Sequence, residues 1–484
     1  MQGIHASELI KKASFVDGKW CESASSFEVR NPYDDALLCH VSDASTEVAT
    51  HAVLAAKRAL KAWAGQSASE RATVLRRWFD LMMQHKADLG RLLTLEQGKP
   101  LSEAEGEVAY GAAFIEWFAE EGKRLYGDII PAPSSDKRIV VIKQPVGVVT
   151  AITPWNFPNA MITRKAAAAL AAGCTFVVKP APETPLSALA IAQLAQQAGI
   201  PKGVFNVVVG TDSQGIGEVL TQHPDVAKFT FTGSTATGKT LASQCAPHLK
   251  KVSLELGGNA PFIVFEDADL DAAVAGAIVC KFRNAGQTCV CANRILVQSS
   301  IKAEFEEKFL AAVSQLKAGN GLDESVSVGP LINQHALDKV HDRVQRSLAQ
   351  GATLLTGGEK PQDGQFYPVT VVSDVKNAMP IAADEIFGPV APIISFESEE
   401  EAIRIANDTE YGLAAYFYAR DIGRVWRVAE QLEFGMVGIN EGIVSNVAAP
   451  FGGVKHSGMG REGSKYGLDD YVDIKYLCFS GIGA

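Results

Sequence analysis

The chain has 484 residues, more than one hydrophobic core normally supports, so we expect two or more structural units with a ligand-binding cleft between them. Its formal net charge is -10 with acidic and basic residues interleaved, which excludes nucleic acid or an anionic membrane as the main partner. The 8 cysteines are too sparse for a disulfide scaffold and lack paired zinc-binding spacing, so no metal site is expected.

The first part of the chain is predicted to be mainly helical. A short hairpin at Phe15–Trp20 is followed, from about residue 46 to residue 118, by apolar residues at helical spacing with charges on the other faces. Prolines and the β-branched run Arg138–Ile142 then change the pattern. We expect this second segment to be an arm or hairpin that interrupts a domain.

No targeting or membrane segment is predicted. The first 15 residues lack the apolar core of a signal peptide, and no later run reaches the roughly 18 apolar residues that a membrane span requires. The sequence therefore favours a protein of the cytoplasm.

From Val146 onward, short apolar runs alternate with helical stretches. The runs at 146–152, 175–178, 204–209, 228–231 and 251–254 alternate with helices such as 160–172 and 187–198. After Pro261 a second alternation begins with strand 262–265, helix 269–282 and strand 294–298, and it continues to about residue 440. This rhythm is typical of βαβ units with parallel strands. We predict an α/β protein with two parallel-sheet domains that join near residues 256–259.

Cys289 is the first candidate for chemistry. It follows a helix that Gly286 is placed to end, so we expect it on a loop rather than inside the core. A free thiol with a pKa near 8.5 is only a few per cent thiolate at neutral pH, so a nucleophilic cysteine needs a base or a lowered pKa. Without such help, Cys289 is also typical of a small buried apolar residue.

Two further motifs supply candidate partners. Glu255 ends an apolar run and is followed by two glycines, which permit close approach by another group and make Glu255 a candidate base. Pro154 and Pro158 restrict the backbone around Asn156, whose amide could donate to a developing oxyanion. Both motifs are also compatible with ordinary structural turns.

Six motifs in this order resemble those of the aldehyde dehydrogenase superfamily, and the resemblance covers nearly the whole chain. They are Pro154-Trp-Asn-Phe-Pro158, Phe231-Thr-Gly-Ser-Thr235, Glu255-Leu-Gly-Gly258, Gly286-Gln-Thr-Cys289, Glu385-Ile-Phe-Gly-Pro389 and Pro450-Phe-Gly-Gly-Val-Lys455. Within the superfamily, the segments 95–100, 281–294 and 460–466 resemble the NADP-dependent succinate-semialdehyde dehydrogenases.

The resemblance implies a domain organisation. It places a Rossmann-like dinucleotide-binding domain at 1–126 and 146–256 and a Rossmann-like catalytic domain at 257–456. The segments 127–145 and 457–484 would form a small β oligomerisation arm and the C-terminal tail, so a homodimer or homotetramer is expected.

The resemblance also implies a mechanism. Cys289 would attack the aldehyde carbon, and the Asn156 amide with the backbone N–H of Cys289 would stabilise the oxyanion. After hydride transfer to the nicotinamide, Glu255 would activate the water that hydrolyses the thioester. Lys165 matches a lysine thought to assist proton movement, although a solvated helix lysine is an equally simple interpretation.

The implied cofactor is NADP, with NAD used at lower efficiency. Lys179 matches a lysine that contacts the adenosine ribose, and Pro182 stands where NAD-preferring relatives commonly carry a glutamate. Without that carboxylate, a 2′-phosphate meets less repulsion and can pair with Lys179. The other positions that match cofactor-binding residues are Thr153, Trp155, Gly233, Ser234, Gly238, Leu256, Glu385 and Phe387.

The implied substrate is a small semialdehyde with a distal carboxylate. Arg164 and Arg283 match the substrate arginines of the succinate-semialdehyde enzymes, and Ser445 matches a third contact, although surface or interdomain salt bridges would also explain the arginines. Succinate semialdehyde is predicted, with glutarate semialdehyde or another carboxylate-bearing aldehyde as the alternative.

Cys291 lies two residues from Cys289, which suggests a reversible disulfide; simple packing of Cys291 is the alternative.

Three other functions are less consistent with these motifs. Gly233–Thr240 fits the Walker A pattern, but an ATPase would leave the Cys289 and Asn156 motifs unexplained. A thiol hydrolase would need a histidine directed at Cys289, yet none of the 9 histidines falls in these motifs. A catalytically silent homologue would require a broken set of residues, whereas Cys289, Glu255 and Asn156 are all present.

Overall fold

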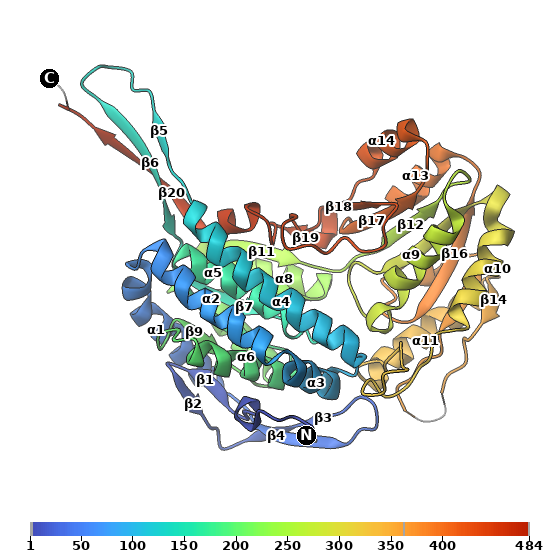
Figure 1. Cartoon of the computed structure of the whole chain (residues 1–484), viewed down its shortest axis with the longest axis horizontal. Helices are drawn as coiled ribbons and strands as arrows, with labels where there is room; N and C mark the ends of the chain where they lie inside the picture. The colour runs from blue at the N-terminus through green and yellow to red at the C-terminus, as the bar shows by residue number, and fades with distance from the viewer. Residues whose placement is uncertain (1–2, 362–363, 483–484) are drawn as a thin grey trace.

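Two large sheets organise the protein, one in each lobe, and a narrow β arm projects from the first lobe (Figure 1). The structure is a computed structural model that describes residues 3–361 and 364–482. Both sheets have parallel strands at their centres, which confirms the predicted α/β class.

The first sheet has eight strands. Its five central strands are parallel, because helices or long crossovers separate them in sequence, whereas both edges are antiparallel. The order is β19 (Gly458–Met459), β11 (Lys251–Glu255), β10 (Val226–Thr232), β7 (Val148–Ile152), β8 (Thr175–Lys179), β9 (Phe205–Val207), β1 (Ser14–Val16) and β2 (Lys19–Cys21).

Helices cover this sheet and form most of the first lobe (Figure 1). The predicted opening hairpin is confirmed, with Phe15 opposite Trp20, and the predicted helix 160–172 has the same bounds in the structure. The helices are α1 (Thr46–Ala64), α2 (Ala68–Gln84), α3 (Lys86–Gln97), α4 (Leu101–Glu121), α5 (Ala160–Ala172), α6 (Pro185–Gln197), α7 (Ser213–Gln222) and α8 (Thr235–Cys245), and a hairpin of β3 (Ser26–Arg30) and β4 (Leu37–Ser42) lies beside them.

The second sheet has seven strands, all parallel except the edge strand β14. Its order is β14 (Thr353–Thr356), β15 (Thr370–Ser373), β16 (Val390–Phe396), β13 (Ala292–Gln298), β12 (Ala260–Val264), β17 (Ala414–Tyr418) and β18 (Met436–Ile439). The helices of this lobe are α9 (Leu270–Phe282), α10 (Lys302–Val313), α11 (Gln334–Ala349), α12 (Pro380–Ala383), α13 (Glu399–Asn407) and α14 (Ile422–Gln431).

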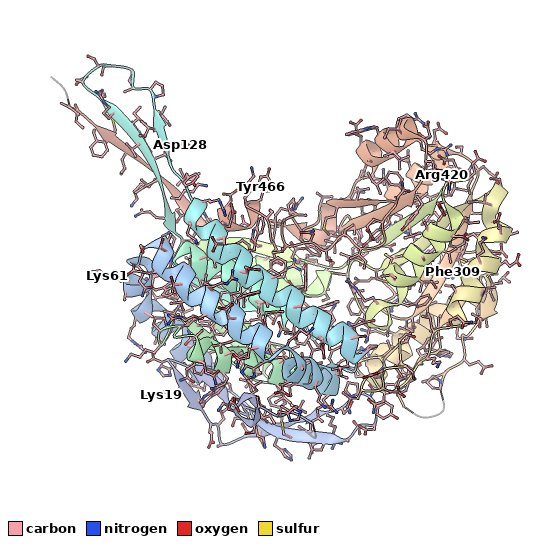
Figure 2. The ribbon with its side chains drawn as sticks, viewed as in Figure 1. Lys19, Lys61, Asp128, Phe309, Arg420 and Tyr466 are labelled. Atoms are coloured by element: carbon pink, nitrogen blue, oxygen red, sulfur yellow. The ribbon has the colours of Figure 1, made fainter. Side chains whose placement is uncertain are left out.

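The arm is a three-stranded antiparallel sheet of β5 (Asp128–Ile130), β6 (Arg138–Pro145) and β20 (Val472–Phe479). It reaches away from the body, with Asp128 on its first strand (Figure 2). Ile129 and Ile474 are 82% and 74% exposed, so the arm carries apolar side chains in contact with solvent. Residues 458–459 pair with the first sheet rather than with the arm, and the strand that the C-terminal segment adds to the arm is 472–479.

Helix α9 ends at Phe282, in agreement with the predicted helix 269–282, so Gly286 is not the residue that ends it. A turn with left-handed backbone at Asn284, Ala285 and Gly286 follows the helix. Among the described residues, no helix combines the length and apolar character that crossing a bilayer requires.

Candidate active site

The carboxyl ends of neighbouring parallel strands bring several predicted residues together. Thr153 follows β7, Gly233 follows β10, and Glu255 and Lys179 end β11 and β8. Because these strands are parallel and adjacent, their ends lie at one edge of the sheet, the edge at which α/β proteins bind ligands. The sheet therefore places four candidate positions along one edge.

Cys289 lies on the loop between α9 and β13, as predicted. The Gly257-Gly258 pair permits the close approach that its motif suggested: a Cβ on Gly258 would lie 2.2 Å from the carbonyl oxygen of Cys289. The left-handed turn before the loop costs strain at Asn284 and Ala285, whose φ angles are 51° and 54°. The backbone around the thiol is therefore tightly constrained.

Cys289 lines two cavities, one of about 620 Å³ and one of about 270 Å³. We call these the larger and the smaller cavity. Burial, followed by the carboxylates of Glu385 and Glu255, raises the pKa of Cys289 to about 12, while Arg164 and Arg283 act in the opposite direction. The sulfur is therefore a thiol at neutral pH unless a base or a bound cation assists it.

Glu255 lines the larger cavity and is 3% exposed. Burial raises its pKa well above the usual value, and the negative charge of Glu462 adds to this, whereas Arg164 and Lys165 oppose it. Its Oε2 is buried without a hydrogen-bond partner among the described residues. A carboxylate with a raised pKa and a free oxygen is a stronger base than an ordinary glutamate, so it can take a proton from a water molecule or a thiol.

Lys165 is fully buried, so its interpretation as a solvated lysine is wrong. It forms an ion pair and a hydrogen bond with Glu462, which also pairs with Arg164. Both cations lower the pKa of Glu462 despite its burial, so that carboxylate is ionised. Glu462 and Lys165 are therefore bonded to each other, and the charges of both act on the pKa of Glu255.

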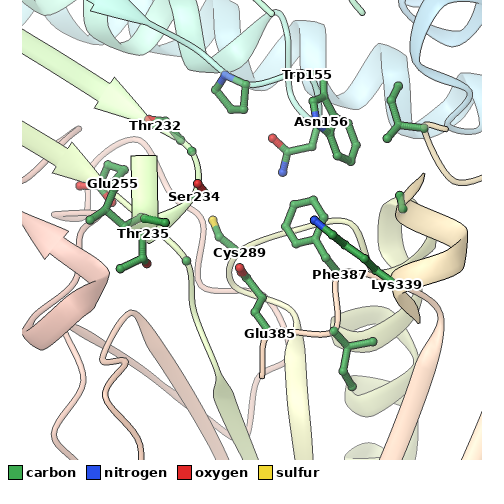
Figure 3. Close-up of a pocket in the computed structure, with 18 of the residues that line it drawn as sticks. Trp155, Asn156, Thr232, Ser234, Thr235, Glu255, Cys289, Lys339, Glu385 and Phe387 are labelled. Carbon is green, nitrogen blue, oxygen red and sulfur yellow. The ribbon is translucent and has the colours of Figure 1, made fainter. Parts of the chain in front are cut away.

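Asn156 lines the larger cavity on the side opposite Glu255, with Cys289 between them (Figure 3). Its side-chain Nδ2 donates a hydrogen bond of 3.0 Å to the backbone carbonyl of Gln287, two residues before Cys289. An amide nitrogen carries two hydrogens, so one remains for a ligand. The geometry therefore keeps the Asn156 amide against the Cys289 loop.

The larger cavity fits a dinucleotide. The rings of Trp155 and Phe387 meet edge to face with centroids 5.5 Å apart, and Glu385 accepts a 3.0 Å hydrogen bond from the backbone N–H of Gly258. Burial raises the pKa of Glu385 to about 7. Ser234 caps the N-terminus of α8, which supplies the partial positive charge that attracts phosphate groups. Further lining residues include Gly233 and Leu256, and Gly238 packs against Leu256.

The other end of this region lies near Lys179. Thr153 and Lys179 are buried, and the backbone N–H of Thr153 donates to the carbonyl of Lys179. Glu183 lines the larger cavity, and both Glu183 and Pro182 line a neighbouring cavity of about 330 Å³. Burial lowers the pKa of Lys179, and the charges of Glu183, Asp43 and Asp212 oppose this effect. A phosphate group bound here would be attracted by Lys179 and repelled by the three carboxylates.

The smaller cavity contains the predicted substrate residues Arg164, Arg283 and Ser445. Arg164 is 1% exposed, its guanidinium lies 4.2 Å from the ring centroid of Phe451, and its Nη1 and Nη2 have no hydrogen-bond partner among the described residues. Arg283 lies over the ring of Phe157 at 5.6 Å. Two guanidinium groups thus border a cavity that also contains the thiol.

Two other predicted positions lie outside this arrangement. Cys291 is a free, buried thiol whose Sγ accepts a hydrogen bond of 3.2 Å from Nζ of Lys281. Lys239, the lysine of the Walker-like motif, lies on the exposed side of α8 and contacts His456 Nδ1 at 3.4 Å. Neither side chain lines one of the cavities described above.

Sequence reasoning missed Glu462 and Lys339. Glu462 is 297 residues from Lys165, so no local pattern connects them. Lys339 lines the larger cavity and points toward its interior near Phe387 (Figure 3). It belongs to the strongly amphipathic helix α11, where a lysine is normally assigned to solvent.

The chain is similar to known proteins over nearly its full length. A model of the aldehyde dehydrogenase family matches residues 20–477. A 3-sulfolactaldehyde dehydrogenase of Pseudomonas putida is 56% identical over 477 residues, 98% of each chain. A glutarate-semialdehyde dehydrogenase of Pseudomonas aeruginosa is 56% identical over 481 residues, and the NADP(+) succinate-semialdehyde dehydrogenase GabD of Escherichia coli is 56% identical over 478; both matches cover 98% of this chain and 99% of the relative.

The fold is also similar to that of a solved structure over nearly the whole chain. The crystal structure of an NADP-dependent enzyme of Escherichia coli superposes with a TM-score of 0.97 at 55% identity, covering 99% of this chain and 100% of the other.

Proposed function

The chain belongs to the aldehyde dehydrogenase family, and from that premise we propose that it oxidises succinate semialdehyde to succinate with reduction of NADP. The observation that carries the proposal is the position of Cys289, which lines the dinucleotide-sized cavity and also the smaller cavity with its two arginines. An aldehyde bound in the smaller cavity would reach the sulfur from one side, while a cofactor in the larger cavity would approach from the other.

The first step is attack of the Cys289 sulfur on the aldehyde carbon. The sulfur must lose its proton, which passes to solvent water in the cavity, as the carbon–sulfur bond forms, because its pKa is raised in the free protein. The Asn156 amide and the backbone N–H of Cys289 donate to the oxygen that becomes negative. NADP, when bound, supplies the acceptor for the hydride that leaves the thiohemiacetal carbon, and a thioester on Cys289 results.

The second step is hydrolysis of that thioester. Glu255 takes one proton from a water molecule, which attacks the thioester carbonyl; the C–S bond breaks, the second proton of the water passes to the Cys289 sulfur, and the product leaves as a carboxylate. The proton then needs a route away from Glu255. Lys165 and Glu462 are hydrogen-bonded to each other and act electrostatically on Glu255, so we assign the movement of this proton to them.

Arg164 and Arg283 bind the distal carboxylate of the substrate, together with Ser445. The assignment is supported by the buried, unpartnered Nη atoms of Arg164 and by the presence of all three residues in one cavity with Cys289. The relatives named for glutarate semialdehyde and 3-sulfolactaldehyde favour the same anionic class with a different length or head group. One methylene changes binding by only about 1 to 3 kcal/mol, so glutarate semialdehyde is the alternative substrate.

Arg283→Ala is expected to raise KM for succinate semialdehyde at least about tenfold, because a charge-assisted hydrogen bond contributes roughly 1.5 to 3 kcal/mol. KM for an uncharged aldehyde such as propanal should change far less. Steady-state kinetics with both substrates measure the difference. Equal losses on both aldehydes would remove Arg283 from carboxylate binding.

NADP is preferred over NAD because Lys179 can pair with the 2′-phosphate, and Pro182 adds no further carboxylate to those already near this lysine. Pro182→Glu is therefore expected to lower kcat/KM for NADP at least about tenfold while leaving that for NAD unchanged or higher. Glu183→Gln is the matched control: it removes a carboxylate beside the same position and should improve use of NADP. An unaltered ratio of the two cofactors in Pro182→Glu would contradict the assignment.

Several further features belong to the same proposal. The exposed apolar side chains of the arm make it the surface on which copies of this chain assemble into a dimer or tetramer.

The enzyme acts in the cytoplasm, where degradation of 4-aminobutyrate would supply the semialdehyde. A peroxide would take up the two electrons and two protons of the Cys289 and Cys291 thiols as their disulfide forms, and the enzyme would stay inactive until an added thiol reduces that bond. The domain boundaries at 1–126 with 146–256, 257–456, and 127–145 with 457–484 are likewise proposed.

A further inference from the structure

The backbone carbonyl of Asn156 is held by two buried donors. Nζ of Lys99 donates to this oxygen at 2.7 Å, and Nδ2 of Asn284 donates to it at 3.0 Å. Lys99 and Asn284 are both 2% exposed, so water does not compete for these bonds. The backbone of the residue that carries the oxyanion amide is therefore fixed from two directions.

Lys99 also connects this carbonyl to the beginning of α5. Its Nζ lies 2.6 Å from Oε2 of Glu107, and both side chains are 1% exposed. Oε1 of Glu107 accepts hydrogen bonds from the backbone N–H groups of Asn159 and Ala160, at 2.9 and 3.2 Å. Lys99 further lies 3.9 Å from the ring centroid of Phe157. One buried ion pair thus contacts the chain at Asn156 and in the four residues after it.

A second carboxylate of α4 holds the loop of Cys289. Oε2 of Glu103 accepts a 2.8 Å hydrogen bond from the backbone N–H of Asn284, in the left-handed turn. The Asn284 side chain accepts from Gln97 at 3.0 Å and donates to the carbonyl of Gln287 at 3.2 Å. Glu103 and Glu107 are four residues apart, so they lie on one face of α4. That face therefore binds both loops that supply the proposed oxyanion donors.

We propose that the Lys99–Glu107 ion pair, with Asn284 as the second donor, positions the Asn156 amide against the Cys289 loop and so forms the oxyanion site. The inference rests on the proposed function, which gives Asn156 that task. Burial of both ions disfavours an arrangement made only for stability, because well-packed apolar residues of similar volume are often equally or more stable. A lysine serves here because its ammonium group can donate at the same time to a carbonyl and to a carboxylate.

The test compares Lys99→Met/Glu107→Gln with Asn156→Ala and with the triple variant. The double change removes both charges together, so no unpaired ion is left buried, and glutamine retains an acceptor for the start of α5. Because Lys99 and Glu107 also border the smaller cavity, the probe is a small uncharged ester, p-nitrophenyl acetate, whose hydrolysis needs the thiol and the oxyanion site but no cofactor. Alkylation of Cys289 by iodoacetamide, which forms no oxyanion, reports on the thiol alone.

We expect the double variant to hydrolyse the ester roughly tenfold to a hundredfold more slowly, with kcat for aldehyde oxidation falling in parallel and the alkylation rate unchanged. In the Asn156→Ala background, the same double change should slow ester hydrolysis further by less than about twofold, because the side chain that the ion pair positions is already absent. If the double variant does not fold, Asn284→Gly replaces it: glycine keeps the left-handed turn and removes only the side-chain bonds, and the same pattern is expected.

Three results would overturn the inference. If the rate losses of the double variant and of Asn156→Ala multiply in the triple variant, the ion pair serves general stability. The same holds if the alkylation rate of Cys289 falls together with activity. A raised KM for the semialdehyde with normal ester hydrolysis would make Lys99 a substrate ligand. Ester hydrolysis that is undiminished in Asn156→Ala itself would instead refute the proposed function, on which the inference rests, because it would remove the oxyanion task from Asn156.

Discussion

Cys289→Ser is expected to lower kcat/KM for succinate semialdehyde by at least about 10³-fold. The serine hydroxyl is nearly the same size as the thiol but ionises far less readily, and the cavity already raises the pKa of the group at this position through burial and through Glu385 and Glu255. The hydroxyl would therefore attack the aldehyde as a neutral and much weaker nucleophile. Steady-state formation of NADPH, followed by absorbance, measures the loss.

The control for this variant is cofactor binding. The thiol forms only part of the wall of the larger cavity, so the dissociation constant for NADP, measured by quenching of tryptophan fluorescence, should hardly change. Cys291→Ser is the matched variant, since it alters a buried thiol two residues away that lines none of the described cavities, and it should keep most of the activity. Undiminished turnover in Cys289→Ser would refute covalent catalysis at this residue.

Glu255→Gln is expected to separate the two halves of the reaction. Hydride transfer should still produce about one NADPH per active site in a rapid first phase, while steady-state turnover falls roughly 10²- to 10⁴-fold because a general base for thioester hydrolysis is missing. Glutamine has the size of glutamate but cannot accept the proton from water. Stopped-flow absorbance resolves the first phase from the slow turnover that follows.

The pH dependence checks the same step. Glu255 acts as a base only when it is ionised, and burial raises its pKa, so steady-state turnover of the unaltered enzyme should increase with pH through that raised pKa. In Glu255→Gln this dependence should disappear from the slow phase. If the variant loses the first phase and the slow phase equally, Glu255 acts before the thioester forms and its assignment to hydrolysis is wrong.

Much of the fold could be predicted because local patterns determine it. The helix at 160–172 and the hairpin with Phe15 opposite Trp20 follow from apolar spacing and turn residues that lie close together in the sequence. The glycine pair after Glu255 also had a recognisable physical meaning, since a side chain on Gly258 would collide with the carbonyl of Cys289. Such features need little information from distant parts of the chain.

The parts that could not be predicted depend on contacts between distant segments. Glu462 pairs with Arg164 and Lys165 across about 300 residues, and this pairing turns an apparently solvated lysine into a buried one. The end of α9 at Phe282 matches the prediction, but the left-handed backbone at Asn284 and Ala285 that follows it does not come from a local pattern. Glu103 accepts a hydrogen bond from the N–H of Asn284 in this turn. No local pattern specifies that contact.

The buried charges explain why the site needs several elements at once. Arg164 and Lys165 are on α5, Glu255 ends β11, and Glu462 belongs to the C-terminal segment, so their mutual stabilisation exists only in the folded chain. An isolated ion in such a place would be costly, whereas two cations beside two carboxylates offset one another. The electrostatic setting of the candidate base is thus a property of the whole first lobe.

The most direct measurement of covalent catalysis is mass spectrometry of Glu255→Gln after brief incubation with NADP and succinate semialdehyde. Covalent catalysis at Cys289 requires that the intact chain gain the mass of one succinyl group and that, after digestion, this group lie on the peptide containing Cys289. A chain without any adduct after NADPH has been released in the first phase, or an acyl group on another residue, would contradict it.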